Sequence, residues 1–280
     1  MTVFSAPAQF DGVAPSALPY GLFSVAQLEP VNDTRFENGI GYYAYPCGPA
    51  KKFDQCATVV VPKTTSTQTA PTDFGAFTVY LAAQCTMRGV GNDDDEYRRR
   101  AMASFTAYEQ QQVELEFWEG GIQPNNPHLT TINPTLPNGA TTTNVVNGIA
   151  LLEGIITRDA VLHVSRRLAT AMASARVLND DDVGDNVLRT FLGTPVIAGA
   201  GYTGKEPSGQ PANTGTVEWA YVTTRPSVFR SQAQLLPDNT AEALNRTLND
   251  FTIYAERQYV VAFDQCIRAA VRIDRNQTTP

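Results

Sequence analysis

The sequence predicts an α+β protein, because one long amphipathic helix and two shorter helices are followed by a strand-rich C-terminal part. The chain has 280 residues, of which 42% are hydrophobic and 18% are charged, so it can bury a substantial core. This order of elements, with most strands after the helices, is typical of the α+β class. The longest apolar runs, such as Ile149 to Leu152, are far shorter than the ~20 residues of a membrane helix.

The charge balance excludes several classes of partner. The 21 Lys and Arg residues face 28 Asp and Glu residues, which gives a net charge of −7. Nucleic-acid affinity is carried by cationic side chains, so a DNA-binding module is disfavoured. No N-terminal stretch combines a basic start with an apolar block, and we therefore expect neither secretion nor a membrane partner.

The four cysteines are spread along the chain, at Cys47, Cys56, Cys85 and Cys266. They show neither the paired spacing of a zinc site nor the density of a disulfide scaffold. We expect reduced and mostly buried thiols, with a Cys47 to Cys56 bridge as the alternative.

Residues suited to catalysis are scarce. His128 lies in a Pro- and Asn-rich loop, and His163 lies in an alternating stretch where a half-buried structural imidazole is favoured. A small hydrolase could combine His163 with Ser165 and Asp159, but no G-x-S-x-G elbow aims a nucleophile. We predict no enzyme activity, no catalytic or metal-binding residues and no cofactor, and keep the hydrolase as a remote alternative.

Residues 1–50 are predicted to form an extended arm, because prolines block long helices there and no period is sustained. Aromatic side chains are unfavourable in water, so the arm should lie against apolar surface. The aromatic residues on which this expectation rests are Phe4, Phe10, Tyr20, Phe23, Tyr42, Tyr43 and Tyr45.

Residues 56–85 predict a long hairpin that projects from the body. β-branched and aromatic residues mark one strand at Ala57–Pro62 and another at Phe74–Gln84. The polar connector Lys63–Asp73 has few apolar groups to pack.

The strongest predicted helix opens at Asn92–Glu96 and runs to about Trp118, before Gly120 and Gly121. Its acidic start suits the free N–H groups and partial positive charge of a helix N-terminus, so we favour a cap over a metal cluster. At ~1.5 Å per residue the helix is about 36 Å long, more than a small domain needs. One apolar stripe is predicted from helical spacing, formed by Tyr97, Ala101, Phe105, Tyr108 and Leu115.

Two shorter helices are predicted over about 143–157 and 165–178, with a buried strand at 160–164 between them. The acidic turn at 179–185 lacks the glycine position and the closing Glu of a calcium loop, so a solvated turn is favoured. The glycine-rich stretch 199–205 lacks the spacing of a phosphate loop, because Lys205 is followed by Glu206.

The remaining strands are predicted from β-branched and alternating segments. They lie at 194–198, 216–223 and 227–232, and a terminal pair is expected from 251–257 with 260–273.

Three segments make this order of elements similar to a known family. Arg189–Ala198, with Leu192-Gly193 before Pro195-Val196, is similar to a leucine-glycine-x-proline-valine strand entry. Phe251–Arg257, followed by Tyr259–Phe263, is similar to a closing strand with a glutamate-arginine step, and Val217–Tyr221 takes the place of an aromatic strand. The chain thus resembles the tailed-bacteriophage major capsid proteins, whose Hong Kong 97-like fold is shared with encapsulin shells.

The resemblance implies a division of the chain, which we state as an expectation. It has an N-terminal arm at 1–50, an extended hairpin loop at 51–92, a spine helix and the start of the peripheral domain at 93–139, an axial domain at 140–245 and return strands of the peripheral domain at 246–280. The extended loop would overlap a neighbouring subunit, and the axial domain would surround the capsomer centre.

The same resemblance implies a major capsid protein that self-assembles into hexamers and pentamers of an icosahedral head. It would be made in the bacterial host cytoplasm and end in the virion, with portal, scaffolding and decoration proteins as further partners. Packaged DNA would be near it without specific contact, which suits an acidic subunit. An encapsulin-like compartment shell and another virion structural protein are the alternatives.

Two departures from the family pattern concern assembly. Some members join neighbours through a Lys–Asn isopeptide bond, for which Lys63 is the candidate here, with an ordinary solvated Lys as the alternative. The sequence shows no long, charged, helical N-terminal segment and begins with Met1, so we expect a separate scaffolding protein.

Overall fold

The computed structural model describes residues 12–48, 50, 71–85, 94–179, 186–238, 240–245 and 250–277. They form two compact units, a smaller one from the described parts of Met1–Ala17, Tyr80–Tyr108 and Gln234–Glu256, and a larger one from the described parts of Leu18–Val79, Glu109–Ala233 and Arg257–Pro280. Helices and strands both contribute, which confirms the predicted α+β class. No helix among the described residues is long and apolar enough to cross a membrane.

The larger unit is built on a five-stranded sheet in the order β14-β9-β6-β8-β7. Its strands are β6 (Ala160–Ser165), β7 (Leu188–Arg189), β8 (Pro195–Gly199), β9 (Val217–Thr224) and β14 (Arg268–Asp274). β6 pairs parallel with β8 and antiparallel with β9, and all of its residues are buried. Continuous burial is typical of a strand covered on both faces of its sheet.

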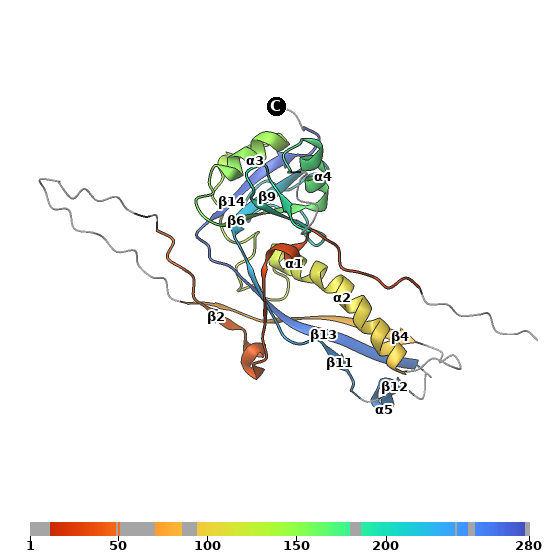
Figure 1. Cartoon of the computed structure of the whole chain (residues 1–280). Helices are drawn as coiled ribbons and strands as arrows, with labels where there is room; N and C mark the ends of the chain where they lie inside the picture. Colours follow the sequence, from red (N-terminus) through yellow and green to blue (C-terminus); the bar gives the residue numbers. More distant parts are fainter. Residues whose placement is uncertain are drawn as a thin grey trace, which may run out of the picture. The chain divides into compact units, whose positions relative to one another are not determined.

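Helices α3 (Val145–Glu153) and α4 (Arg166–Ser174) lie against one face of this sheet (Figure 1). Because side chains alternate along a strand, Leu162 and Val164 of β6 both belong to the core under these helices. Both helices are shorter than predicted. α3 ends at its C-cap Gly154, and a left-handed φ of 56° at Arg176 follows the end of α4.

The C-terminal turns of helix α2 (Asp94–Glu119) cover the opposite face of the sheet. The ring of Phe117 lies 5.4 Å from that of His163, and Trp118 lies 4.7 Å from Tyr202 and 5.0 Å from Tyr221. The predicted long helix is therefore confirmed, and its end is fixed by aromatic packing.

The apolar stripe predicted on α2 is right in its first half and wrong in its second. Tyr108 and Leu115 are exposed. One buried row of α2 instead repeats every four residues and includes a carboxylate, so an apolar pattern does not reveal it. Its members are Ala101, Phe105, Glu109, Val113 and Phe117, and further buried residues follow beside it in the last turns of the helix.

Strand β13 (Asp250–Ala262) runs through both units and is also paired with β4 (Phe77–Cys85). In the smaller unit it pairs with β11 (Gln234–Leu236) and β12 (Leu244–Asn245). In the larger unit it pairs with β10 (Ser227–Arg230), which pairs in turn with β1 (Gln27–Pro30). The predicted pairing of 251–257 with 260–273 is wrong. Residues 250–262 form the single strand β13, and β14 pairs with β9 instead. Between these strands, at 263–267, the chain leaves the sheet of β13 and enters the five-stranded sheet.

The smaller unit has its own apolar cluster, in which the ring of Tyr97 lies 6.2 Å from that of Phe251. The other buried members of this cluster are Ala101, Ala243 and Ile253.

The predicted hairpin strand at 74–84 is divided into two strands. β3 (Thr72–Phe74) pairs with β2 (Ile40–Tyr42), whereas β4 begins after a break at Gly75 and Ala76. The connector therefore ends before Thr72 instead of at Asp73. The first predicted strand at 57–62 and the crosslinking candidate Lys63 lie outside the described residues.

Short elements tie residues 18–48 of the predicted arm to the larger unit. The ring of Phe23 lies 6.0 Å from that of Tyr259, as expected for an aromatic residue that lies against apolar surface. Phe36, which the sequence reasoning did not single out, is buried too. Tyr43 and Tyr45 differ, because they are 71% and 78% exposed. The elements not yet named are α1 (Leu22–Val25), the 3-10 helix Thr34–Asn38, β5 (Pro137–Ala140) and α5 (Thr240–Ala243).

Two substitutions on opposite faces of α2 test the assigned helix orientation. Val113→Asp should prevent soluble folding, because it buries a carboxylate at a cost of several kcal/mol. Leu115→Asp, on the exposed face, should change the free energy of unfolding by no more than about 0.5 kcal/mol. Circular dichroism and urea unfolding measure both, and equal damage from the two variants contradicts the assignment.

Candidate functional site

A hairpin turn between β7 and β8 presents two large apolar side chains to solvent. The amide of Thr190 donates to the carbonyl of Thr194 and that of Gly193 donates to the carbonyl of Thr190, each over 2.9 Å. Gly193 has a φ of 83°, in the left-handed region that favours glycine. The result is that Phe191 is 67% and Leu192 is 78% exposed. We call residues 190–194 the apolar turn.

Glu153 of α3 fixes the position of the apolar turn. Its carboxylate accepts hydrogen bonds from the hydroxyl of Thr190 at 2.6 Å and from that of Thr194 at 2.9 Å. Hydrogen bonds to an ionised acceptor are stronger than neutral ones. The two exposed side chains are therefore held beside α3.

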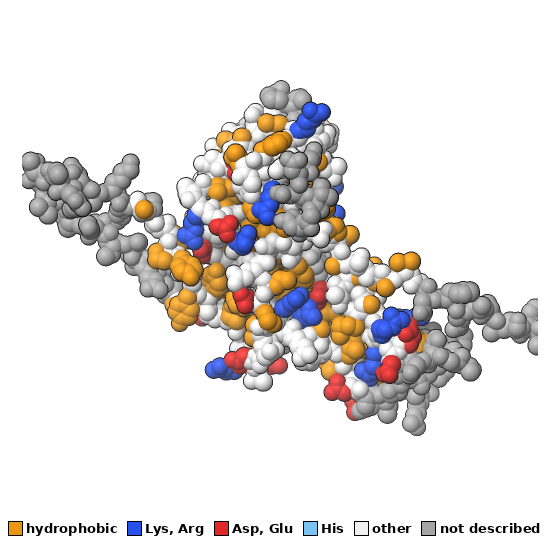
Figure 2. Space-filling model, in the orientation of Figure 1, with side chains coloured by type: hydrophobic (Ala, Val, Ile, Leu, Met, Phe, Trp, Pro, Cys, Tyr) orange, Lys and Arg blue, Asp and Glu red, His pale blue; other side chains and the backbone are white. Residues whose placement is uncertain are grey.

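A groove of about 430 Å³ lies between α3 and the apolar turn, and we call it the α3 groove. Its lining is Val146, Ile149, Ala150, Glu153, Gly154, Val177, Thr190, Phe191 and Leu192. Figure 2 shows that hydrophobic side chains reach the surface among polar ones on the face it draws. Clustered exposed apolar side chains mark interaction sites, whereas single ones are ordinary. The α3 groove is therefore a candidate contact surface.

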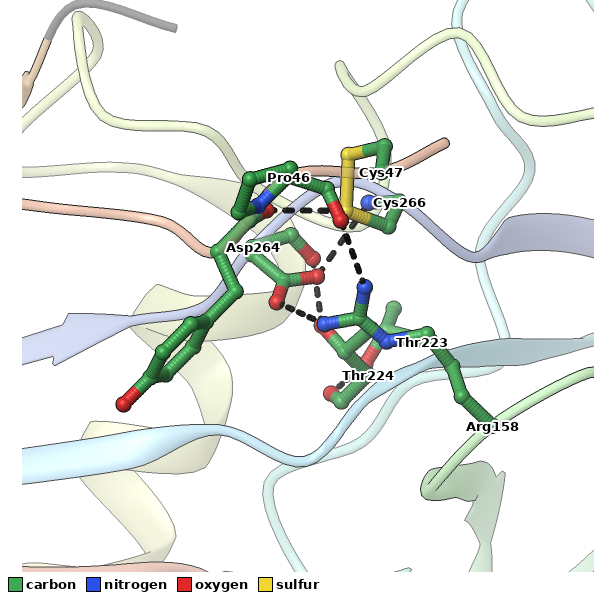
Figure 3. A network of polar contacts seen from close by, with 8 residues as sticks. Pro46, Cys47, Arg158, Thr223, Thr224, Asp264 and Cys266 are labelled. Carbon is green, nitrogen blue, oxygen red and sulfur yellow. Dashed lines mark hydrogen bonds and ion pairs between the residues drawn. A yellow bond between two sulfur atoms is a disulfide. The ribbon is translucent and has the colours of Figure 1, made fainter. Parts of the chain in front are cut away.

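A second candidate site is a network of polar contacts around a disulfide, which we call the loop junction (Figure 3). Arg158 donates to the carboxylate of Asp264 at 2.6 Å and to the carbonyl of Pro46 at 3.5 Å. The hydroxyl of Thr224 donates to the carbonyl of Asp264. The loop junction thus joins the end of β9 and the turn after β13 to the chain just before Cys47.

The loop junction contains a disulfide between Cys47 and Cys266, whose Cα atoms lie 5.0 Å apart. The prediction of reduced thiols is wrong for these two residues, and Cys47 does not pair with Cys56. The bridge spans 219 positions of the sequence, so spacing alone could not reveal it. Closing a loop of this length contributes on the order of 5 kcal/mol in the chain-entropy treatment. Cys56 and the side chain of Cys85 lie outside the described residues.

Two buried carboxylates on α2 hold distant segments in place, and Glu109 is the first. Arg257 of β13 donates to both of its oxygens, at 2.9 and 3.0 Å, and the hydroxyl of Tyr259 also donates to it. Burial raises the pKa of the Glu109 carboxyl, against the opposing effects of Tyr259 and Arg257.

Glu114 is the second, and it is fully buried. Its carboxylate accepts hydrogen bonds from the amides of Leu22, at 2.8 Å, and Gly201, at 2.9 Å. Burial raises the pKa of this carboxyl too. A Cβ at Gly201 would lie 2.1 Å from the carbonyl oxygen of Gln111, so the glycine-rich stretch 199–205 packs on α2 and faces an acidic side chain. This arrangement does not suit a phosphate.

Both histidines have structural surroundings. Nδ1 of His163 lies 3.0 Å from the hydroxyl of Tyr202, and Nε2 lies 2.8 Å from that of Thr223. His163 is fully buried, more than the half-burial expected. Nε2 of His128 lies 2.7 Å from the carbonyl of Gln123.

The residues proposed for a hydrolase do not come together. Ser165 caps α4 by accepting a hydrogen bond from the amide of Leu168 at 3.1 Å. The carboxylate of Asp159 lies 3.6 Å from Arg225 in an ion pair. Since both ring nitrogens of His163 face other hydroxyls, the arrangement lacks a nucleophile–base contact.

The acidic segments identified in the sequence are placed only in part. Residues 180–185 and Asp93 lie outside the described residues. Among the residues that the structure does describe, no group of three or more His, Cys, Asp or Glu side chains could hold a metal ion.

No protein-family model and no curated protein matches the sequence. Solved structures, in contrast, are similar over nearly the whole chain. The capsid of an empty GTA particle, computed with C5 symmetry, is 11% identical with a TM-score of 0.56, over 98% of this chain and 94% of that chain. A chain in the structure of Gordonia phage Cozz is 10% identical with a TM-score of 0.54, over 98% of this chain and 91% of that chain.

An encapsulin has the same architecture. The holo-SrpI encapsulin complex from Synechococcus elongatus PCC 7942 is 11% identical with a TM-score of 0.52, over 98% of this chain and 94% of that chain. At these identities the likeness is one of fold, and it confirms the predicted Hong Kong 97-like fold.

The buried imidazole of His163 gives a pH prediction. Burial lowers its pKa from the ordinary 6.5 to about 3, so between these values the unfolded chain binds a proton that the folded chain does not. The free energy of unfolding should therefore fall as the pH drops below about 6.5, by up to about 1.4 kcal/mol per pH unit from this group.

His163→Gln should remove this contribution. Urea unfolding of both proteins between about pH 7 and about pH 5 measures the difference in slope. Equal slopes of the free energy of unfolding against pH for the wild type and His163→Gln would contradict the lowered pKa of His163.

Proposed function

We propose that this chain is the major capsid protein of a tailed phage, which assembles into the hexamers and pentamers of an icosahedral head enclosing DNA. The observation that carries the proposal is the shared fold, which covers 98% of this chain and more than nine-tenths both of the capsid chain of a GTA particle and of a chain from Gordonia phage Cozz. The GTA capsid was computed with C5 symmetry, which is the symmetry of a pentameric vertex.

In this proposal α2 is the spine helix. The arm is 1–50, the extended loop 51–92, the spine and first peripheral segment 93–139, the axial domain 140–245 and the return strands 246–280. Portal, scaffolding and decoration proteins are further partners, and synthesis takes place in the host cytoplasm.

The α3 groove and the apolar turn fall in the proposed axial domain. Head-to-tail contacts between identical subunits close into a ring when the rotation permits, so each copy can cover the exposed surface of the next. Burying Phe191 and Leu192 contributes about 1.5–3 kcal/mol for each side chain, and a ring repeats this at every subunit. The role is structural rather than catalytic, in keeping with the surroundings of His163.

A protein compartment is the second candidate, because the SrpI encapsulin complex shares the fold. Another structural protein of the virion is the third, and it differs in copy number. Electron microscopy of purified particles separates these functions. DNA-filled or tailed particles support the head, particles loaded with a co-purifying enzyme support the compartment, and a monomer at high concentration contradicts all shell functions.

The apolar turn gives a mutational test of assembly. The double variant Phe191→Asp, Leu192→Asp should keep the circular dichroism spectrum and unfolding midpoint, because both side chains are exposed. Its assembled fraction in sedimentation should fall at least about tenfold, since each shell contact would bury two charges. Ile122→Asp, at an exposed Ile outside the α3 groove, is the control and should assemble normally. Normal assembly of the double variant would show that the apolar turn takes no part in the contact between subunits.

A further inference from the structure

The disulfide lies at the base of the proposed extended loop. Cys47 precedes the start of that loop at residue 51, and Cys266 lies in the turn between β13 and β14 (Figure 3). The bridge therefore connects the loop base to the point where the chain passes from one sheet to the other.

Noncovalent contacts at the loop base are weaker than the bridge. The Arg158 contact to the carbonyl of Pro46 is 3.5 Å long, beyond the usual hydrogen-bond range of ~2.7–3.2 Å. The carbonyl oxygen of Tyr45 lies 3.7 Å from Sγ of Cys266, which is a contact to the bridge itself, and β2 pairs with β3 over three residues further back. Without the disulfide, the chain after Tyr42 depends on these contacts, so the bridge decides how firmly the loop base is held.

Reagents in solution can reach the bridge. Cys47 is exposed and Cys266 is half-buried. Accessible disulfides exchange readily with thiols, and the reducing cytoplasm keeps most protein cysteines reduced. A subunit made in that compartment would start with two thiols at this position.

We propose that Cys47 and Cys266 form a redox latch that closes after synthesis and fixes the loop base in the finished shell. This inference rests on the proposed function. The oxidant is a low-molecular-weight disulfide such as oxidised glutathione. The Cys47 thiolate attacks it and releases one thiol, and the Cys266 thiolate then attacks the mixed disulfide and releases the second.

The two steps balance. The cysteines lose two electrons, the reagent gains them and becomes two thiols, and the protons of the cysteine thiols end on the released thiols. No metal or enzyme cofactor is needed.

The latch also positions an exposed aromatic pair. Tyr43 and Tyr45 precede Cys47 by four and two residues and are largely exposed. Restricting a segment before it binds lowers the ordering cost of binding. A closed latch therefore favours contacts that these tyrosines make with a neighbouring copy, and it strengthens the shell without being needed to form it.

Shells assembled under reducing conditions provide the test. One half is treated with oxidised glutathione and the other is kept in dithiothreitol, and light scattering measures the urea concentration at which each dissociates. The oxidised half should dissociate at a urea concentration higher by about 1 M or more. Cys47→Ser and Cys266→Ser should assemble and show the lower midpoint under both conditions.

The other two cysteines provide the control. The double variant Cys56→Ser, Cys85→Ser keeps the latch and should respond to oxidation as the wild type does. Equal midpoints for oxidised and reduced wild-type shells overturn the latch, as does a redox response that persists in Cys47→Ser. Disulfide-linked oligomers of the Cys56→Ser, Cys85→Ser variant, present on a non-reducing gel and lost on reduction, also overturn it, because the latch joins cysteines of one chain.

A measurement on the free subunit separates this inference from the proposed function. If shells form under neither condition, the proposed function fails. The latch still requires chymotrypsin to cleave after the exposed Tyr43 at least about tenfold faster in the reduced subunit than in the oxidised one, because cleavage needs a segment free to adapt to the protease. Equal cleavage rates overturn the latch whether or not shells form.

Discussion

The burial of two carboxylates on one helix is the constraint on which the larger unit depends. Glu109 is satisfied by Arg257 and Tyr259, and Glu114 by the amides of Leu22 and Gly201. A carboxylate buried without such partners costs several kcal/mol. The end of α2 can therefore be buried only when the N-terminal segment, β13 and the stretch after β8 are all in place, and this requirement makes the arrangement cooperative.

Local sequence patterns predicted the elements that have a strong period of their own. The long helix, the strand at 160–164 and the strands at 194–198 and 216–223 all lie within a few residues of their predicted bounds. The same reasoning assigned the wrong face to the second half of α2. A buried Glu109 has no apolar signature, and its partner Arg257 lies 148 positions away, so the apolar pattern points to Tyr108 and Leu115 instead. The terminal strands were paired wrongly for a related reason, because sheet membership depends on long-range contacts.

In the candidate sites, too, features set by neighbouring residues are predictable from the sequence, whereas features set by contacts with distant segments are not. The Leu192-Gly193 step was identified in the sequence, and the positive φ at Gly193 explains its glycine. Its exposure was not predictable, because Phe191 and Leu192 have the composition of core residues and are turned outward by hydrogen bonds from Thr190 and Thr194 to Glu153. The Cys47–Cys266 bridge was missed because its two ends are adjacent only in the folded chain.

Both sheets join segments that are far apart in the sequence. β1 pairs with β10, so that Gln27 lies opposite Ser227, and the five-stranded sheet under α3 is completed by β14 at 268–274. Contacts between such distant parts of the sequence slow folding, since the entropy of closing large loops is lost before the contacts form. While the ribosome is still adding residues, β1 and β9 wait with unpaired edges that can join those of other nascent chains. The topology therefore delays completion of both sheets until residues 268–274 have been synthesised, and the demand on chaperones is heaviest during this interval.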